Sequence, residues 1–176
     1  MACGGSGRVY GASLPGLLPG TAATAAIAEL DGSATKKIRL LKVVVSGSEL
    51  TAIAVNDLRL TMLSSISTGG TATVGVATPF DSTNPAATAV FRGFTVAPTG
   101  GGVVIGAIAV QKLSLLLIAT NLGTAVVFDF ATLPAAGRPT LHTAAQAIGI
   151  DFNGATPANA PNLDIYAWWT EEPLNA

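Results

Sequence analysis

Turn-forming residues divide this chain into many short segments, and that spacing constrains its fold more than any other feature. Gly, Pro, Asn and Asp gather at positions 19–20, 31–33, 46–48, 69–70, 98–102 and 153–154. The segments between these turns are rich in Val, Ile, Thr and Phe, which favour β-strands. Short strands at regular spacing are typical of an antiparallel sandwich or barrel. The sequence therefore predicts an all-β protein.

Three segments alternate apolar and polar residues with the period of a half-buried strand. In the first, Val126, Phe128 and Phe130 would share one face while Asp129 takes the other, and residues 148–153 and 163–170 alternate in the same way. This pattern is typical of antiparallel sheets with one solvent-facing side. Further strands are expected at 38–45, 51–63, 71–77, 88–96 and 103–112, whereas 21–30 and 113–120 also permit a short helix. We predict one antiparallel β-sandwich domain over residues 21–176. The sequence leaves open whether this sandwich is a jelly roll.

The first twenty residues look different from the rest, because Gly and Pro recur throughout them. Such a composition favours an extended arm outside the sandwich. An arm of this kind would gain stability by burying its apolar side chains on a neighbouring subunit. We therefore predict an extended N-terminal arm at residues 1–20, with these interface residues: Val9, Tyr10, Leu14, Leu17 and Leu18.

The composition favours assembly with other subunits. Charged residues make up 11% of the 176 residues, and hydrophobic residues, mostly small ones, make up 49%. A surface with so few charges loses little hydration energy when another subunit covers it. A net charge of −1 with nine basic residues argues against nucleic-acid binding, which needs a concentrated basic surface. We predict a homo-oligomer that binds no nucleic acid.

No segment of the sequence suits a membrane span. The most apolar stretch, 103–119, is interrupted by Gln111 and Lys112, whereas a spanning helix needs ~20 largely apolar residues. The N-terminus lacks the basic and apolar regions of a signal peptide. Because Cys3 is the single cysteine, no internal disulfide framework is expected. The expectation is a protein made in the cytoplasm of its cell, with no membrane partner.

The residues that carry common enzyme chemistry are scarce. His142 is the single histidine, and no G-x-S-x-G turn presents a serine nucleophile to it. Cys3 has no local partner that would activate its thiol, and the Gly-rich segments lack the phosphate-loop pattern. The sequence therefore predicts a protein that is not an enzyme and needs no cofactor or metal.

Three aspartates leave one chemical alternative open. Asp129, Asp151 and Asp164 each lie between apolar neighbours on predicted strands. If those strands were adjacent, the carboxylates would share a face and could bind a cation or act as the paired acids of a glycosidase. The opposing interpretation, which we favour, is a solvated or inter-subunit face, because a shift of one residue in register moves every side chain.

Two further features concern surfaces. The basic segment 36–42 would place Lys37 and Arg39 on one strand face and Lys42 on the other, which suits either an edge strand or contact with the acidic pair Glu171 and Glu172.

Trp168 and Trp169 are adjacent, so alternation sends one indole inward and the other outward. An outward Trp168 would serve as an interface or carbohydrate contact, or would pack under the N-terminal arm.

The chain also resembles a known class of proteins. The segment 69–99 (GGTATVGVATPFDSTNPAATAVFRGFTVAPT), the strand that opens at 36–39 and closes at 45–47, and the closing 169–172 are similar to small virion structural proteins of tailed bacteriophages. The similarity covers most of residues 36–172 and rests on turns and strands. It implies a β-sandwich or jelly-roll module that cements or decorates a capsid, often as a trimer, without catalytic residues.

These observations lead to one expected function and two alternatives. The expected function is that of a non-enzymatic virion protein, a capsid cement or decoration protein that binds copies of itself, as a trimer, and a major capsid protein. The first alternative is a tail or fibre component that binds a carbohydrate or receptor through a β-sandwich. A glycoside hydrolase built on the aspartates is the second, and it has the least support.

Overall fold

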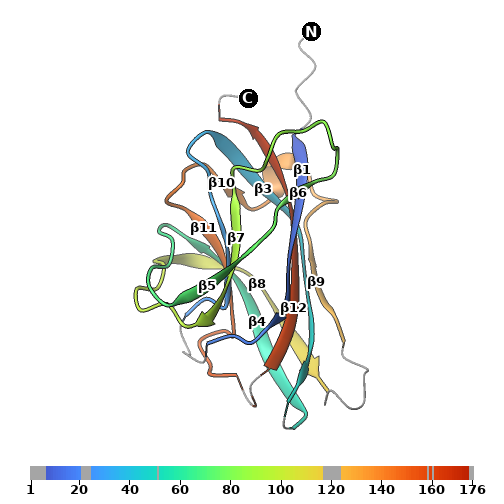
Figure 1. Ribbon diagram of the computed structural model, residues 1–176, viewed down its shortest axis with the longest axis vertical. Coiled ribbons are helices and arrows are strands. Elements are labelled where there is room, and N and C mark those ends of the chain that lie inside the picture. Colours follow the sequence, from blue (N-terminus) through green and yellow to red (C-terminus); the bar gives the residue numbers. More distant parts are fainter. Residues whose placement is uncertain are drawn as a thin grey trace.

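Two six-stranded antiparallel sheets packed face to face make up the fold (Figure 1). The computed structural model describes residues 7–20, 25–50, 52–116, 124–157, 159 and 161–174. Within these residues the helical content is a single 3-10 turn, η1 (Ala135–Gly137). The prediction of an all-β sandwich is confirmed. No helix in the described part of the chain is long and apolar enough to cross a membrane.

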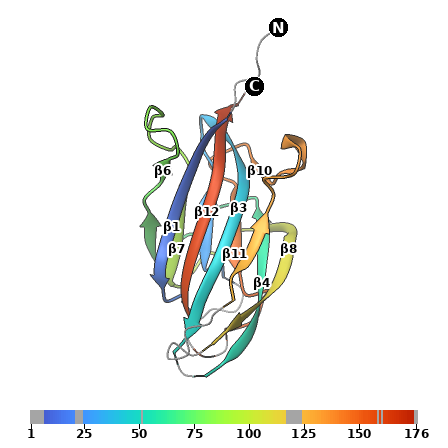
Figure 2. The same cartoon turned by 90° about the vertical axis from the view of Figure 1, so that its right-hand side faces the viewer.

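The first sheet, called sheet 1, is built around two long strands that are far apart in the sequence. Its order is β10-β3-β12-β1-β6, and β9 also pairs with β3. The bounds are β1 (Arg8–Leu17), β3 (Lys36–Glu49), β6 (Thr78–Pro79), β9 (Val126–Asp129), β10 (Thr140–Leu141) and β12 (Pro161–Pro173). Figure 2 shows β1, β12 and β3 in front, with no strand covering them.

The second sheet, called sheet 2, has the order β5-β7-β2-β11-β4-β8. The bounds are β2 (Ala28–Asp31), β4 (Ala54–Leu63), β5 (Thr71–Gly75), β7 (Val90–Val96), β8 (Val104–Leu115) and β11 (Ala147–Asp151). Neither possible helix is helical where the structure describes it: residues 28–30 belong to β2 and residues 113–115 belong to β8. Together the sheets hold twelve strands, whereas a jelly roll has eight, so we describe the fold simply as a β-sandwich.

The predicted alternation places the core between the sheets. On β12, Leu163, Ile165 and Trp169 are fully buried, while Asp164 and Tyr166 point outward. Trp169 stacks on Tyr10 of β1 with 6.2 Å between the ring centroids. Both sheets contribute to one continuous apolar cluster, which is the layered packing that an amphipathic sheet requires.

The prediction of an N-terminal arm is wrong for residues 8–17. These residues form β1, which pairs with β12 from Arg8 opposite Glu171 to Leu17 opposite Leu163. Tyr10, Leu14 and Leu17 are therefore core residues of their own subunit, at most 4% exposed. The domain begins with β1, before the predicted boundary at residue 21. Residues 1–6, including Cys3, lie outside the described residues.

The glycine and proline residues that suggested an arm have other roles in β1. A Cβ on Gly11 would lie 2.6 Å from Cδ1 of Trp168, so only glycine leaves room for that indole. Gly16 adopts a φ of 63° where the pairing with β12 shifts register. Such residues interrupt the visible apolar pattern without ending the strand, because the pairing with the neighbouring strand β12 continues past them.

One long two-stranded ribbon contributes four of the six strands in sheet 2. β4 pairs with β8, and β5 pairs with β7. Between these pairs, the segments 64–70 and 97–103 stay together, because Ser64 N donates to Val103 O and Thr68 exchanges two hydrogen bonds with Gly100. Residues 54–75 and 90–115 thus form a continuous antiparallel ladder, called the ribbon. Its tip, residues 76–89, includes β6 and joins sheet 1 beside Tyr10 and Gly11.

Candidate functional site

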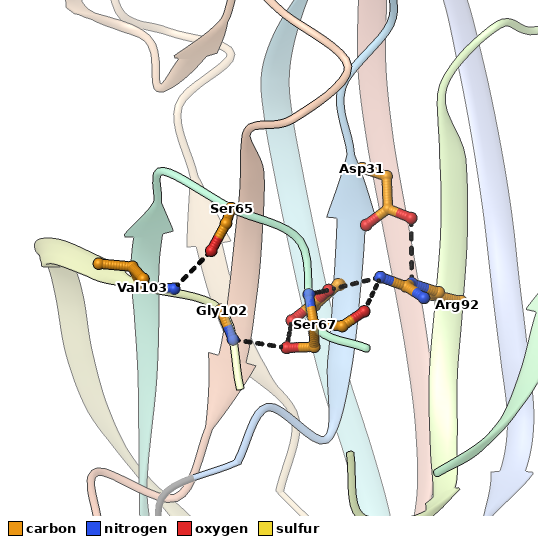
Figure 3. A network of polar contacts seen from close by, with 7 residues as sticks. Asp31, Ser65, Ser67, Arg92, Gly102 and Val103 are labelled. Atoms are coloured by element: carbon orange, nitrogen blue, oxygen red, sulfur yellow. Dashed lines mark hydrogen bonds and ion pairs between the residues drawn. The ribbon is translucent and has the colours of Figure 1, made fainter. Parts of the chain in front are cut away.

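A fully buried carboxylate, that of Glu29 on β2, contacts the ribbon at Ser67. Figure 3 shows Ser67 beside Asp31 of β2 and Arg92 of β7. Ala28 and Leu30 of β2 belong to the core, so Glu29 points to the opposite face, yet its exposed fraction is 0%. The backbone N–H of Ser67 donates to Glu29 Oε2 at 3.1 Å, and the Ser67 hydroxyl donates to Oε1. Arg92 Nη2 donates to Oε2 at 3.0 Å. These three donors compensate for the hydration that the carboxylate loses on burial.

Arg92 of β7 joins two carboxylates to the ribbon. Besides its bond to Glu29, its Nη2 donates to the carbonyl oxygen of Ser67 at 2.8 Å, and its Nε lies 3.0 Å from Asp31 Oδ2. The guanidinium carbon is 5.0 Å from the ring centroid of Phe94, within the range of a cation–π contact. Arg92, on one strand of the ribbon, is therefore held by β2, by Ser67 on the other strand of the ribbon and by a ring on its own strand.

Asp31 is the least compensated member of this cluster. Its Oδ1 is buried and has no hydrogen-bond partner among the described residues. Burial raises the pKa of Asp31 to about 7, Arg92 opposes that shift, and the negative charge of Glu29 reinforces it. One guanidinium thus serves two carboxylates, and the cluster favours a proton on Asp31.

The same cluster fastens both strands of the ribbon to each other. Ser67 Oγ accepts a hydrogen bond from the backbone N–H of Gly102 at 3.0 Å, and Ser65 Oγ accepts one from Val103 N at 2.9 Å. Figure 3 shows these contacts running from β2 and β7 through Ser67 to the start of β8. We call this cluster the Glu29 clamp, because it fixes the part of the ribbon at 64–70 and 97–103, between its two pairs of strands, to β2.

A second ion pair lies beside the clamp. Arg59 of β4 binds Asp151 of β11 through Nε at 3.0 Å, and Asp151 also accepts hydrogen bonds from Thr61 Oγ1 and Asn153 N. The cavity between this pair and Ser67 has a volume of about 10 Å³. Such a space holds one water molecule at most. Both clusters join strands or segments that are distant in the sequence, so their contacts hold the fold together.

The hypothesis that three aspartates share one face is wrong. Asp151 belongs to sheet 2, whereas Asp129 and Asp164 belong to sheet 1. Asp129 forms an ion pair with Lys42 at 2.8 Å, and Asp164 accepts a hydrogen bond from Gly16 N at 2.8 Å. Among the described residues, no group of three potential ligands from His, Cys, Asp and Glu could hold a metal ion.

Sequence reasoning missed the residues that anchor the ribbon. Glu29 and Asp31 alternate with apolar residues in the segment 28–31, which is a strand signal, but the segment also permitted a helix. At the ribbon tip, the buried Glu171 accepts hydrogen bonds from the backbone N–H groups of Thr88 and Ala89 and from Trp169 Nε1. No local pattern shows which carboxylates will be covered by a loop that is distant in the sequence.

The outer face of sheet 1 carries the outward tryptophan. Trp169 is buried and Trp168 is half-buried on the opposite face, as alternation predicts. Lys42 Nζ lies 5.4 Å from the Trp168 ring centroid and also pairs with Asp129. Tyr166, two residues before Trp168 on the same face, is 39% exposed. An aromatic and charged row, formed by Trp168, Tyr166 and the Lys42–Asp129 pair, therefore lies on the outer face of sheet 1. Figure 2 shows that no strand covers this face.

The basic segment does not form an edge strand, because β3 lies between β12 on one side and β9 and β10 on the other. Its predicted contact with the acidic pair is confirmed at Arg39, which binds Glu172 at 3.0 Å. A register shift in the pairing between β3 and β12 places Lys42 opposite Trp168 and Arg39 opposite Thr170. Lys42 and Arg39 thus face the same way, and the expected separation of these two side chains is wrong.

Three of the remaining predicted interface residues line grooves, and the fourth, Leu18, is simply exposed. Leu14 and Leu17 line a largely apolar groove of about 370 Å³ between the end of β1 and the edge strand β5, although little of either side chain is exposed. Leu18 is 50% exposed. Val9 is half-buried and lines a second groove of about 280 Å³ with Phe80.

His142 is exposed, and its backbone N–H donates to Gln146 Oε1.

Comparison of the chain with protein-family models, curated proteins and solved structures found no match.

Proposed function

We propose that this protein is a non-enzymatic structural protein of a tailed-phage virion, a cement or decoration protein that stabilises the capsid through subunit contacts. It is made in the host cytoplasm, forms a homotrimer and binds the major capsid protein. The trimer and the capsid partner follow from the resemblance of residues 36–172 to such proteins. The observation that carries the proposal is an exposed apolar surface without charges.

That surface lies on the ribbon. Residues 60–76 and 93–111 contain no charged side chain. They pair with each other through β5, β7, β4 and β8, so the two uncharged segments run side by side along the ribbon, whose strands β5 and β8 are the two edges of sheet 2. Seven of their large apolar side chains are exposed: Val74, Val76, Val96, Val103, Val104, Ile105 and Val110. Large exposed apolar regions mark sites of protein association.

The placement of the polar residues supports the same proposal. The carboxylates of Glu29 and Asp151 neutralise arginines, and that of Glu171 holds backbone N–H groups of the ribbon tip. An acid–base catalyst must instead reach a substrate through an open site. These three carboxylates therefore hold the fold together, and the exposed apolar side chains remain for binding a partner.

The copy number in purified particles tests the proposal. Quantitative mass spectrometry of particles from the phage that encodes the chain should find it at a copy number comparable to that of the major capsid protein. Particles that lack the protein should release DNA at lower temperature, and adding the purified protein should restore their stability. Absence of the protein from the particle, or unchanged stability without it, would refute a cement role.

A tail or fibre component that binds a carbohydrate is the second candidate. The observation in its favour is the row on sheet 1, where Trp168 and Tyr166 lie on an uncovered face beside the Lys42–Asp129 ion pair. Aromatic rings beside polar groups suit sugar binding. This candidate predicts few copies per particle and binding to host-surface glycan that Trp168→Ala removes, while Val127→Ala, on the same face of β9, leaves it intact.

A further inference from the structure

The sequence contains one asparagine that is followed by glycine, and the structure places this pair in an exposed turn. Asn153 and Gly154 follow β11, and both are exposed. They are the two central residues of a turn that Ala155 N closes by donating to Phe152 O at 3.0 Å. We propose that Asn153 is a site of spontaneous modification, at which the side-chain amide is lost and an aspartate or isoaspartate is formed.

The reaction uses two groups of this turn and water. The backbone nitrogen of Gly154 loses its proton and attacks Asn153 Cγ. A bond forms between these two atoms, the bond from Cγ to the side-chain nitrogen breaks, and that nitrogen leaves as ammonia with the proton. A five-membered succinimide ring remains. Water then opens the ring, and it gives aspartate when it adds at Cγ and isoaspartate when it adds at the main-chain carbonyl.

The two reacting groups are not held by hydrogen bonds. The backbone N–H of Asn153 donates to Asp151 Oδ1 at 2.7 Å. Among the described residues, the side-chain amide of Asn153 and the N–H of Gly154 have no hydrogen-bond partner. The amide therefore turns toward Gly154 without breaking a contact, and the Gly154 nitrogen loses its proton without giving up a hydrogen bond.

Glycine at position 154 makes the ring easier to close. Ring closure requires rotation of the backbone and the side chain of Asn153, which now belong to a turn with a φ of 54° at Asn153 and 78° at Gly154. Glycine enters many backbone conformations at low cost. Apart from the neighbours in the chain, no atom lies within 4 Å of the position that a Cβ of Gly154 would occupy. On that side, nothing outside the turn hinders the rotation.

Water reaches the turn, and the product changes its electrostatics. Asn153 lines an open groove of about 260 Å³ with Asp57 and Lys112, which form an exposed ion pair. The product adds one negative charge, so the net charge of the chain changes from −1 to −2. This charge appears beside Asp151, whose ion pair with Arg59 joins β11 to β4. The modification therefore alters a turn that is hydrogen-bonded to a structural ion pair.

A second asparagine is a control within the same chain. Asn159 is exposed and has a φ of 61°, close to that of Asn153, but Ala160 follows it in the sequence. Its side-chain amide also donates to Ala52 O at 3.4 Å. Alanine enters fewer backbone conformations than glycine does. We therefore expect the reaction at Asn159 to be slower by about tenfold or more, which is about 1.4 kcal/mol in the barrier.

Storage of the purified full chain at pH 8.5, followed by isoelectric focusing and peptide mapping by mass spectrometry, tests the proposal. We expect an acidic species that carries aspartate or isoaspartate at position 153, and slower conversion at pH 6, where less of the Gly154 nitrogen is deprotonated. Gly154→Ala should slow the conversion by about tenfold. Asn153→Gln should remove this acidic species, whereas the matched control Asn159→Gln should leave it unchanged.

The comparison of Asn153 with Asn159 in the wild-type chain needs no variant, so it decides the proposal even where a variant fails to fold. An isoaspartate-specific methyltransferase identifies the isoaspartate product. An unmodified Asn153 after long storage at pH 8.5, equal rates at the two asparagines, or conversion only in urea-unfolded protein would each overturn the proposal.

Discussion

Replacing Asp31 by Asn should stabilise the protein at alkaline pH, because Asp31 is buried with incomplete compensation. Its Oδ1 has no hydrogen-bond partner in the described structure, and Arg92 is shared with Glu29. Burial raises the pKa of Asp31 from 3.8 in the unfolded chain to about 7 in the folded protein. Asparagine keeps the shape of the side chain and removes the charge, so the variant isolates the effect of ionisation.

The sign of the effect follows from proton binding. The folded state holds a proton on Asp31 more tightly than the unfolded state does, so the stability from this residue is fully present below about pH 4. It is lost as the pH rises toward 7. A shift of about three pH units corresponds to about 4 kcal/mol, which is the upper limit of the loss. We expect Asp31→Asn to exceed the wild type by about 1–4 kcal/mol at pH 8.5 and to differ little near pH 4.

Urea unfolding at several pH values between 4 and 8.5, followed by circular dichroism, measures this difference in the free energy of unfolding. The matched control is Asp57→Asn, which removes an exposed ion pair with Lys112 and should change stability by less than about 1 kcal/mol at each pH. A difference between Asp31→Asn and the wild type that does not change with pH would refute the reasoning. A variant that is less stable at pH 8.5 would mean that the ion pair with Arg92 outweighs the effect of burial.

Three further predictions concern the fold. Deleting residues 1–17 should abolish cooperative thermal unfolding, because β1 lies between β12 and β6; a folded truncated protein would restore the arm hypothesis. Ser67→Ala should lower the free energy of unfolding in urea by about 1–3 kcal/mol and speed amide hydrogen exchange at 64–70 and 97–103, because Glu29 and Gly102 each lose a hydrogen-bond partner. The control Ser82→Ala, in the exposed ribbon tip, should change neither the stability nor the exchange. Gly11→Ala should lower the free energy of unfolding by about 1–3 kcal/mol and change the tryptophan fluorescence, because the new methyl group meets the Trp168 indole. An unchanged spectrum and an unchanged stability would contradict this close contact.

The sequence alone determined the class of the fold and the direction of many side chains. Alternation with a period of two assigned Trp169 to the core and Trp168 to the outer face, and it predicted which residues of 163–169 are buried, whereas Thr170, expected on the outer face, is buried as well. These predictions succeed because the direction of a strand side chain depends only on its own position along the strand.

Only the tertiary structure decided which strands are neighbours. β1 was misread as an arm because Gly11, Pro15 and Gly16 interrupt its apolar pattern, while its stability comes from β12, about 150 residues later. Asp151 was separated from Asp129 and Asp164 by sheet order, which no local signal encodes. Glu29 became a buried anchor because the ribbon passes over it. Pairing between distant strands is set by the packing of the whole core, so its consequences for these polar residues cannot be read from their sequence neighbours.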